Sequence, residues 1–506
     1  MEVNQRKAGV LLAYTLTGTN VLVGFIYIPL LIYFLGQEEY GLYQLMGSFL
    51  VYLGLFDFGL SNTITRYYSK YMALKDEKGK ENLLALSSII YTILTIILLI
   101  FSIILYFYLD EIFQKSLTDS EIITAKYMYI VIVITTMITI PTSLFNSVIN
   151  ANERFVFLKL LSIVQTIIRP FIVLTVFMFE ANALILVIIQ ALINLLGIIF
   201  KIHYSFNKLQ LKIKYHYFDK NLLKELFHYS FFIFVTMIMD QIFWRSDQII
   251  LGILVGTASV AVYSIGSQIV MYYMSLSLAM SGVFLPNITK RVMHNATKTE
   301  LTDTFIRVGR LQYILLGAVV SGFILFGKEF ISVWVGDDFT LSYYITIIIM
   351  IPFTIDLIQN IGLTILKAKN MYSFRAIVFL GMALLNITIS IPLAMYYGGI
   401  GTAAATGASY IIGNGLIMNI YYYKKVGLNV FKFWKNILKL SVSLFISFIM
   451  GVFINLITIE IELISLLFKI ILYIVIYILV IWRLGMNNYE KKLILNLLRA
   501  VLRFKK

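Results

Sequence analysis

The chain has 506 residues, of which 60% are hydrophobic and 13% charged, and its formal net charge is +15. So large an apolar fraction excludes a soluble globular domain and predicts a polytopic membrane protein. Cysteine is absent, and the four histidines, at positions 203, 216, 228 and 294, fall in basic segments between apolar stretches. We therefore expect no disulfide, no metal centre and no other cofactor.

Apolar stretches long enough to cross a membrane recur along the whole chain. We predict an all-α protein with about fourteen spans, at residues 8–35, 40–71, 83–109, 122–149, 157–179, 181–206, 221–255, 259–292, 304–326, 341–366, 372–397, 399–423, 430–457 and 461–482. Lysine and arginine gather in every second joint between spans, whereas the other joints are tight turns such as Gly36-Gln37-Glu38-Glu39. By the positive-inside rule, both termini are cytoplasmic. The net positive charge is then a topology signal, and nucleic-acid binding is not expected.

Short segments recur in the same order about 220 positions apart. Leu35-Gly36 returns as Val255-Gly256, and the segment 62–66 resembles 287–291. This order predicts an N-lobe of six spans (1–215), a C-lobe of six spans (216–428), two further spans (429–485) and a basic amphipathic cytoplasmic tail (486–506). Two lobes of equal orientation would be related by an axis along the membrane normal, as in alternating-access transporters.

The seventh span carries three charges near its middle. Two adjoining helical stripes hold its polar groups, with Asp240, Trp244 and Asp247 on one and Gln241, Arg245 and Gln248 on the other. At 1.5 Å per residue, Arg245 lies about 15 Å from the end of the span, near the middle of a ~30 Å hydrocarbon core. A charge there costs about 2.5–3.5 kcal/mol on insertion scales, which makes the cluster a candidate binding site. Alternatively, an aspartate and an arginine of the cluster pair locally. Such a pair would only allow this polar helix to pack inside a helix bundle and would have no role in binding.

The repeat provides an internal comparison for this cluster. Its charged positions align with Asn20, Phe25 and Tyr27 in the first span. The fold therefore does not require charged residues at these positions. This favours a function of the charges that is specific to the lobe containing the seventh span.

Polar residues interrupt other spans as well. Asp57 lies between Gly54 and Gly59, where it could line a cavity or cap a break in the helix. Arg169 precedes Pro170 and could face a cavity or satisfy the carbonyl group that the proline frees. Asp356, near Gln359 and Asn360, is a second candidate lining patch, and Lys469 is expected to snorkel or to face lipid.

Trp244, Asp247, Gly252, Gly256 and Tyr263, together with the paired lobes and the basic tail, resemble the Wzx-type polysaccharide flippases of the multidrug/oligosaccharidyl-lipid/polysaccharide (MOP) exporter superfamily. The resemblance covers essentially the whole chain and implies a V-shaped transporter in the bacterial cytoplasmic (inner) membrane. It implies a non-enzymatic flippase that moves an undecaprenyl-pyrophosphate-linked oligosaccharide to the outer leaflet without ATP hydrolysis. The cargo would be the repeat unit of a lipopolysaccharide O-antigen, a capsule or an exopolysaccharide, and polysaccharide polymerase and chain-length proteins would be partners.

The resemblance also implies roles for the polar residues. Arg245 and Arg169 would meet the pyrophosphate or acidic sugars, and other substrate-binding positions would be Gln241, Trp244 and Asn20. The aspartates would either pair with the arginines or couple transport to H⁺ or Na⁺, and they are Asp240, Asp247, Asp57 and Asp356.

Two other functions stay open. A cation-coupled multidrug antiporter of the same superfamily would carry protons or sodium on Asp57, Asp240 and Asp356. It would be favoured if the two arginines were buried in ion pairs. A membrane polymerase or glycosyltransferase acting on lipid-linked sugars would need a large hydrophilic loop, and the loops of this chain are short and rich in lysine.

Overall fold

The computed structural model describes residues 5–294, 296–457 and 460–503. In these ranges all regular secondary structure is helical, which confirms the predicted all-α class. The chain forms two compact units, unit 1 (Met1–Ala261) and unit 2 (Val262–Lys506). The predicted lobes, which divide at residue 215, stay a prediction about internal symmetry.

Eleven helical segments of the described chain are long and apolar enough to cross a membrane. Two of them, Gln5–Ala73 and Ser373–Val426, have 69 and 54 residues, far more than the ~20 that one crossing needs. Each bends at a glycine with positive φ, at Gly36 (φ 74°) and at Gly398 (φ 55°). Both glycines lie where turns are predicted. The multi-pass fold is therefore confirmed, whereas the count of fourteen spans stays a prediction.

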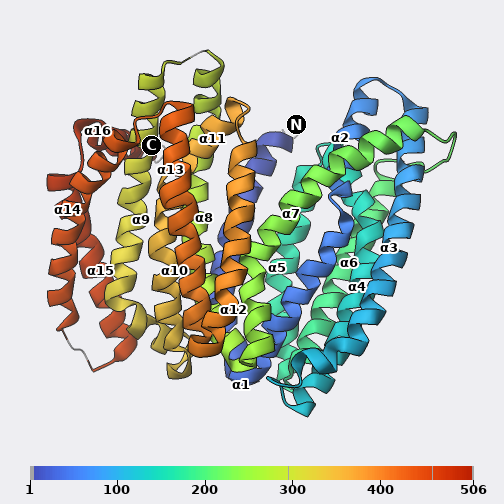
Figure 1. Cartoon of the computed structure of the whole chain (residues 1–506), viewed down its shortest axis with the longest axis horizontal. Helices are drawn as coiled ribbons and strands as arrows, with labels where there is room; N and C mark the ends of the chain where they lie inside the picture. Colours follow the sequence, from blue (N-terminus) through green and yellow to red (C-terminus); the bar gives the residue numbers. More distant parts are fainter. Residues whose placement is uncertain (1–4, 295, 458–459, 504–506) are drawn as a thin grey trace. The chain divides into compact units, whose positions relative to one another are not determined.

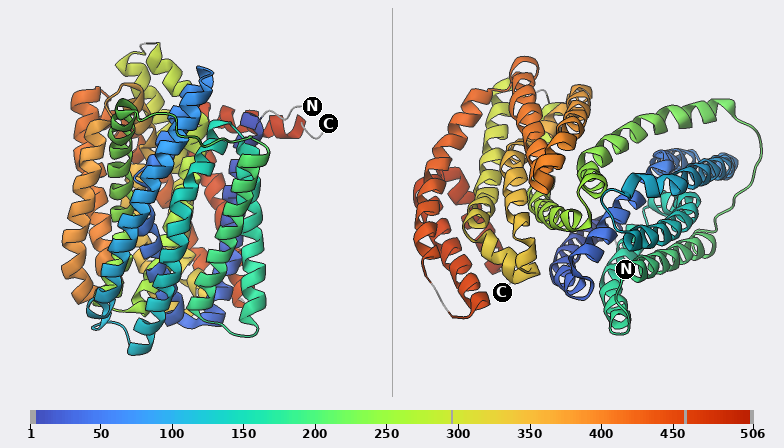
Figure 2. Two further views of the ribbon diagram at one scale, coloured as in Figure 1. Left: turned by 90° about the vertical axis from the view of Figure 1, so that its right-hand side faces the viewer. Right: turned by 60° about the horizontal axis from the view of Figure 1, so that its bottom comes forward.

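Unit 1 is a bundle of long helices that begins at the N-terminus (Figure 1). The helices are α1 (Gln5–Gly54), α2 (Leu60–Ala73), α3 (Glu77–Phe113), α4 (Asp119–Ala151), α5 (Phe155–Phe177), α6 (Ala183–Asn207) and α7 (Lys220–Leu254), with the 3-10 turn η1 (Leu55–Asp57) after α1. Helices α1, α4, α5 and α6 pack against one another (Figure 2). Their inward faces therefore come from widely separated parts of the sequence.

Capping side chains fix where several of these helices begin. Thr118 and Glu121 form a reciprocal capping box at α4, and Asp76, Asn182 and Asp219 accept backbone hydrogen bonds at the starts of α3, α6 and α7. Each cap satisfies an amide group that the first turn of a helix leaves without a partner. The spans predicted to start at 122, 181 and 221 begin within four residues of their caps, whereas the span predicted from 83 begins seven residues after Asp76.

The helical path breaks at the glycine pair around Asp57. Phe58 and Gly59 both have positive φ, 50° and 69°, and η1 separates α1 from α2. The Asp57 carboxylate accepts hydrogen bonds from the Tyr91 hydroxyl (2.9 Å) and from the Ser61 amide (3.4 Å). Asp57 therefore caps this break, which is one of the two roles that its position suggests.

Helix α7 packs within unit 1 against α1, α2 and α3. Ser48 Oγ donates to Gln248 Oε1 at 2.5 Å, and Ser116 Oγ donates to the Gly252 carbonyl at 2.6 Å. A Cβ at Gly252 would lie 2.4 Å from Leu45, so glycine allows α1 and α7 to approach closely. This packing holds the charged middle of α7 against α1.

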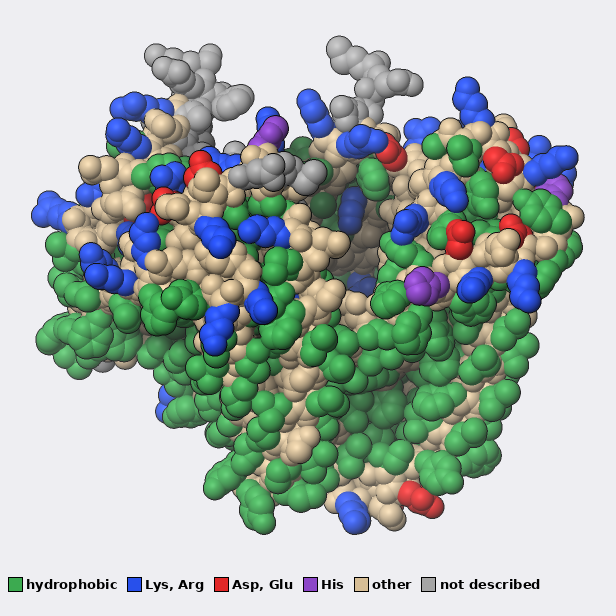
Figure 3. Space-filling view, turned by 45° about the horizontal axis from the view of Figure 1, so that its top comes forward, with side chains coloured by type: hydrophobic (Ala, Val, Ile, Leu, Met, Phe, Trp, Pro, Cys, Tyr) green, Lys and Arg blue, Asp and Glu red, His purple; other side chains and the backbone are tan. Residues whose placement is uncertain are grey.

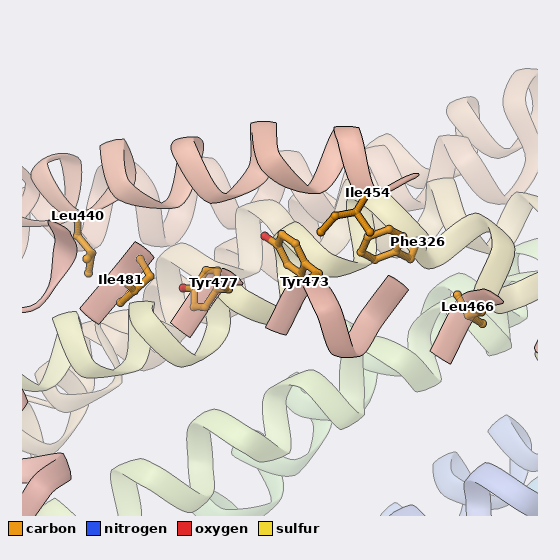
Figure 4. Packing of buried hydrophobic residues seen from close by; sticks show 7 residues of the cluster. All are labelled: Phe326, Leu440, Ile454, Leu466, Tyr473, Tyr477 and Ile481. Carbon is orange, nitrogen blue, oxygen red and sulfur yellow. The ribbon is translucent and has the colours of Figure 1, made fainter. Parts of the chain in front are cut away.

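Unit 2 contains the remaining helices. They are α8 (Thr257–Met293, which begins in unit 1), α9 (Lys298–Val335), η2 (Asp337–Phe339), α10 (Leu341–Ile358), α11 (Asn360–Ala368), α12 (Ser373–Tyr410), the π-helix η3 (Ile411–Ile417), α13 (Met418–Tyr421), the π-helix η4 (Tyr422–Val426), α14 (Val430–Asn455), α15 (Glu462–Val480), the π-helix η5 (Ile481–Gly485) and α16 (Asn488–Arg503). Helix α15 packs on α9 and α14 through a buried cluster that includes Phe326, Tyr473 and Tyr477 (Figure 4).

Lys469 corrects one prediction. Its side chain is 8% exposed, and its Nζ lies 2.9 Å from Glu329 Oε2 of α9. The expectation that Lys469 snorkels or faces lipid is wrong, because a carboxylate 140 positions away lies beside it and compensates its charge.

Hydrophobic side chains cover the outward faces of the helices. In α3, for example, Ile93, Ile97, Ile100 and Ile104 are all exposed. Figure 3 shows a broad area of hydrophobic side chains on the visible face, with most of the visible lysine and arginine side chains gathered in the upper part of the view. Exposed isoleucines at helical spacing suit contact with lipid rather than with water.

Candidate functional site

Two arginines of unit 1 belong to one electrostatic cluster. Arg169 of α5 and Arg245 of α7 are both half-buried, and both interact electrostatically with the hydroxyl group of Tyr43 on α1. Arg169 also interacts with Tyr27, and Arg245 with Tyr52. We call these five residues the arginine site. Both cations that the sequence singles out thus lie within electrostatic range of one tyrosine, although they belong to different helices.

A short hydrogen-bonded chain holds Arg245. Its Nη1 donates to Gln248 Oε1 at 3.2 Å, and the same amide oxygen accepts from Ser48 Oγ at 2.5 Å. Asp247 is 2% exposed and interacts electrostatically with Tyr52. Arg245 is therefore positioned by α1 through Gln248, one helical turn further along α7.

Arg169 lines a cavity of about 390 Å³ inside unit 1. Its Nε is buried and has no hydrogen-bond partner among the described residues. Tyr43 lines the same cavity, and its hydroxyl donates to Gln190 Oε1 at 2.9 Å. A guanidinium keeps its charge in proteins, so a buried N–H of this kind is suited to an acceptor brought by a ligand.

Neither arginine forms an ion pair in the part of unit 1 that the structure describes. The ion pairs there join Arg6 to Glu153, Lys80 to Glu77 and Lys126 to Asp110, and the His216 ring nitrogen contacts Glu81. Arg245 bonds to an amide instead of a carboxylate. Half-buried cations without a carboxylate partner favour an anionic ligand.

The other residues predicted to bind substrate have different surroundings. Asn20 is exposed, and its Oδ1 accepts from Thr166 Oγ1 at 3.0 Å, one turn before Arg169 on α5. The Gln241 carbonyl accepts a long hydrogen bond (3.4 Å) from the Tyr52 hydroxyl, and the Trp244 ring lies 5.6 Å from that of Phe243. Asn20 and Gln241 thus border the arginine site.

The four aspartates do not share one environment. Asp240 is exposed and Asp247 buried, although both lie on the same stripe of α7. Asp57 lines the same cavity as Arg169. Asp356 belongs to unit 2, where its Oδ1 lies 3.6 Å from Nη2 of Arg375. Among the described residues, no group of three or more histidines, aspartates and glutamates is arranged to hold a metal ion.

Sequence reasoning missed several residues that the structure brings to these sites. The sequence does not single out Tyr43 or Gln190 as site residues, although the polar positions 190 and 194 of α6, spaced by one turn, are a visible signal. Arg375 lies near the start of the span predicted at 372–397, yet it is 6% exposed, pairs with Asp356 and stacks over the Phe379 ring at 5.0 Å. Its partner could not be seen from spacing, because α11 intervenes.

Comparison with known sequences places the protein in a class. The sequence matches the family described as polysaccharide biosynthesis protein over residues 7–292, more than half of the chain. The chain therefore belongs to this family. It is also 22% identical over 222 residues to the probable low-salt glycan biosynthesis flippase Agl15 of Haloferax volcanii. That match covers 44% of this chain and 46% of the relative, so it spans about half of the relative's length.

Solved structures share the fold. The lipid II flippase MurJ in an inward closed conformation has a TM-score of 0.74 at 19% identity, and the match covers 94% of this chain and all of that one. An inward-facing MATE-family multidrug resistance transporter of the MOP superfamily has a TM-score of 0.63 at 14% identity, covering 80% of this chain and 95% of the other. The predicted fold, that of multi-helix exporters of this kind, is thereby confirmed. At these identities the likeness concerns the fold, and the cargo needs a separate argument.

Proposed function

We propose that this protein moves an undecaprenyl-pyrophosphate-linked oligosaccharide from the inner to the outer leaflet of the bacterial cytoplasmic membrane by alternating access. It acts as a transporter, performs no covalent chemistry and needs no ATP. Membership in the polysaccharide biosynthesis protein family and the similarity to a glycan biosynthesis flippase support this proposal. Both termini lie in the cytoplasm.

The observation that carries the proposal is the arginine site. Arg169 and Arg245 interact with one tyrosine, and neither has a carboxylate partner in the described part of unit 1. Such a site suits the phosphate oxygens of a lipid-linked sugar through charge-assisted hydrogen bonds. The isoprenoid tail stays in the bilayer while the head group crosses through the polar interior. A few such contacts bind the head group and still allow its release.

A cation-coupled multidrug antiporter is a second candidate, because Asp57 lines the same cavity as Arg169. In that case Asp57 would carry the coupling proton or sodium ion. Asp57 already accepts hydrogen bonds from Tyr91 and Ser61, and a guanidinium in the same cavity repels cations. The flippase is therefore the better supported function.

The test replaces the gene by variants and measures surface polysaccharide together with lipid-linked oligosaccharides retained on the cytoplasmic side. We expect Arg169→Ala and Arg245→Ala to reduce export tenfold to about a hundredfold, the equivalent of the ~1.5–3 kcal/mol of a hydrogen bond to a charged group. Membrane levels of both variants should equal that of the wild type. Arg154→Ala, at the exposed N-cap of α5, is the matched control and should export normally.

Normal export by both site variants would contradict the proposal. Loss of export in Asp57→Asn together with normal export in the arginine variants would favour the antiporter.

A further inference from the structure

A groove of about 630 Å³ lies between α2, α3 and α7 of unit 1. These helices pack on one another (Figure 1). Leu60 of α2 and Leu94 of α3 belong to the buried part of the groove wall, whereas Ile97 of α3 and Phe231 of α7 are exposed at its edges. The groove is therefore an apolar hollow that opens to the surroundings of a membrane-spanning bundle, where the surrounding medium is lipid.

Two polar side chains of α7 also line this groove, Lys224 and His228. They are one turn apart, at the four-residue spacing that places side chains on one helical face, and both are exposed. The His228 ring lies nearly perpendicular to the Phe232 ring, with centroids 5.1 Å apart, and this contact restrains the imidazole. A lysine ammonium and an imidazole N–H both donate hydrogen bonds, so together they suit a phosphate group.

The neighbouring carboxylate points to other partners. Glu225 interacts with Tyr67 and Tyr71 of α2, and it does not belong to the lining of the groove. Arg66 of α2 adds a further cation beside α7, because its guanidinium lies 4.4 Å from the centre of the Tyr229 ring. The end of the groove nearest the start of α7 is therefore positively charged.

The order of polar and apolar groups along the groove matches that of a phospholipid. At 1.5 Å per residue, Lys224 and His228 lie about 6 and 12 Å from the first residue of α7. In the proposed orientation, this end of α7 is on the cytoplasmic side, where the leaflet carries anionic lipids. The apolar lining continues from there along α7 to Phe231 and along α3 to Ile97, deeper in the bundle.

We propose that this groove binds an anionic glycerophospholipid of the inner leaflet. The lipid phosphate meets Lys224 and His228, and one acyl chain occupies the apolar part of the groove. A lipid held there contacts three helices at once and braces α7 against α2 and α3.

This lipid is distinct from the cargo. Lys224 and Arg245 are separated by about 30 Å along α7 at 1.5 Å per residue, so a phosphate at one does not reach the other. Among the described residues, the linings of the groove and of the cavity beside Arg169 have no member in common. The inference therefore does not depend on the identity of the cargo.

Other occupants fit the groove less well. A zwitterionic lipid would bring its own ammonium group close to Lys224. A soluble anion would leave the apolar lining uncovered. A peptide would have to place its backbone amides against a lipid-facing surface, where unpaired polar groups are costly.

The test measures lipid binding to purified, delipidated full-length protein by native mass spectrometry. The probes are palmitoyl-oleoyl phosphatidylglycerol, phosphatidylcholine with the same chains, and undecaprenyl phosphate. We expect the wild type to bind phosphatidylglycerol about fivefold more tightly than phosphatidylcholine, the order of preference that one lysine near an anionic lipid provides.

Two matched pairs of variants assign this preference to the groove. Lys224→Gln/His228→Gln should lose the preference, whereas Lys220→Gln, one turn earlier on the exposed start of α7, should keep it. Ile97→Trp should fill the groove and weaken phosphatidylglycerol binding about tenfold, because overpacking excludes the acyl chain. Ile93→Trp, similarly exposed one turn earlier on α3 but outside the groove lining, should bind as the wild type does. All variants should retain the wild-type melting temperature in detergent.

Three results would each overturn the proposal. They are equal binding of the two phospholipids by the wild type, a preference retained in Lys224→Gln/His228→Gln, and equal phosphatidylglycerol binding by Ile97→Trp and Ile93→Trp. Undecaprenyl phosphate that binds more tightly than phosphatidylglycerol, and loses this affinity in Lys224→Gln/His228→Gln, would also overturn it, because the groove would then hold a carrier lipid.

Discussion

At the level of single residues, the middle of α7 holds one residue suited to bind the cargo and neighbouring residues that keep it in position. Arg245 presents its guanidinium at the arginine site, and Gln248 links it to Ser48 of α1. Asp247 is buried next in sequence and interacts with Tyr52. Because Asp247 is buried and Arg245 bonds to an amide, we infer that Asp247 helps to hold this part of α7 in place and does not bind cargo.

This inference predicts that Asp247→Asn is milder than Arg245→Ala. Asparagine keeps the shape and most of the hydrogen-bonding capacity of the side chain, so we expect export to fall less than about tenfold, a loss below ~1.4 kcal/mol. The measurement is surface polysaccharide per molecule of protein in the membrane, for both variants in the same strain. A loss in Asp247→Asn as severe as that in Arg245→Ala would indicate cation coupling through Asp247.

The sequence was informative about charged residues and poor at finding their partners. Arg169 and Arg245 could be singled out because a charge in an apolar span is costly wherever it lies. Tyr43 could not be singled out, because tyrosine is common in the apolar stretches of this chain. It can be recognised as part of the site only once the fold shows that the arginines of α5 and α7 interact with it. For Asp57 the sequence is partly informative: the neighbouring glycines indicate the break in the helix, but only the fold shows that Tyr91 is its hydrogen-bond partner.

Among the helices, α16 is held to the rest of unit 2 by a buried ion pair in addition to its amphipathic face. Glu490 is fully buried, and Arg310 of α9 pairs with it at 2.6 Å. Arg310 also donates to the carbonyls of Asn436 (3.1 Å) and Gly485 (2.9 Å). The start of the basic tail is therefore anchored to α9 and α14, whereas the pattern of the sequence predicts only a helix lying on the inner leaflet.

Breaking this buried pair should destabilise unit 2. Glu490→Gln leaves the Arg310 charge without its partner, a change that costs about 3–5 kcal/mol in buried ion pairs. The double variant Arg310→Met/Glu490→Leu should recover most of this loss, because apolar side chains of similar size can replace such a pair. Thermal unfolding in detergent measures both, with Lys492→Ala on the exposed side of α16 as the control. Equal melting temperatures for Glu490→Gln and the wild type would contradict the anchoring role.

Helix positions could be predicted closely, and helix partners could not. Apolar length and glycine turns are local signals, and apolar length locates α4, α6 and α7 to within about three residues, whereas α3 begins six residues before the predicted span at 83–109. The pairs Arg310–Glu490 and Lys469–Glu329 join positions 180 and 140 residues apart. No local pattern contains that information, because burial and partnership arise only when the helices pack.

For the molecule as a whole, the fold alone leaves the cargo open. A lipid II flippase and multidrug transporters share it with this chain. The observation on this chain that bears on the cargo is the charge of the arginine site, where two cations lack carboxylate partners in the described part of unit 1. A cation-binding antiporter would need the opposite charge at its site. The sign of the cargo's charge is therefore the property that an experiment on the intact protein should test.

An anionic head group makes transport sensitive to the membrane potential. A potential negative inside favours outward movement by about 2.3 kcal/mol per charge for each 100 mV across the full field. In proteoliposomes with an imposed potassium diffusion potential, we expect a fluorescent short-chain sugar pyrophosphate to move faster towards the positive side. Reversing the sign of the potential should reverse the preference, and vesicles containing Arg245→Ala should show neither movement. A transport rate that does not change with the membrane potential would mean that the charge of the head group is fully neutralised during crossing, for example by cations that move with it.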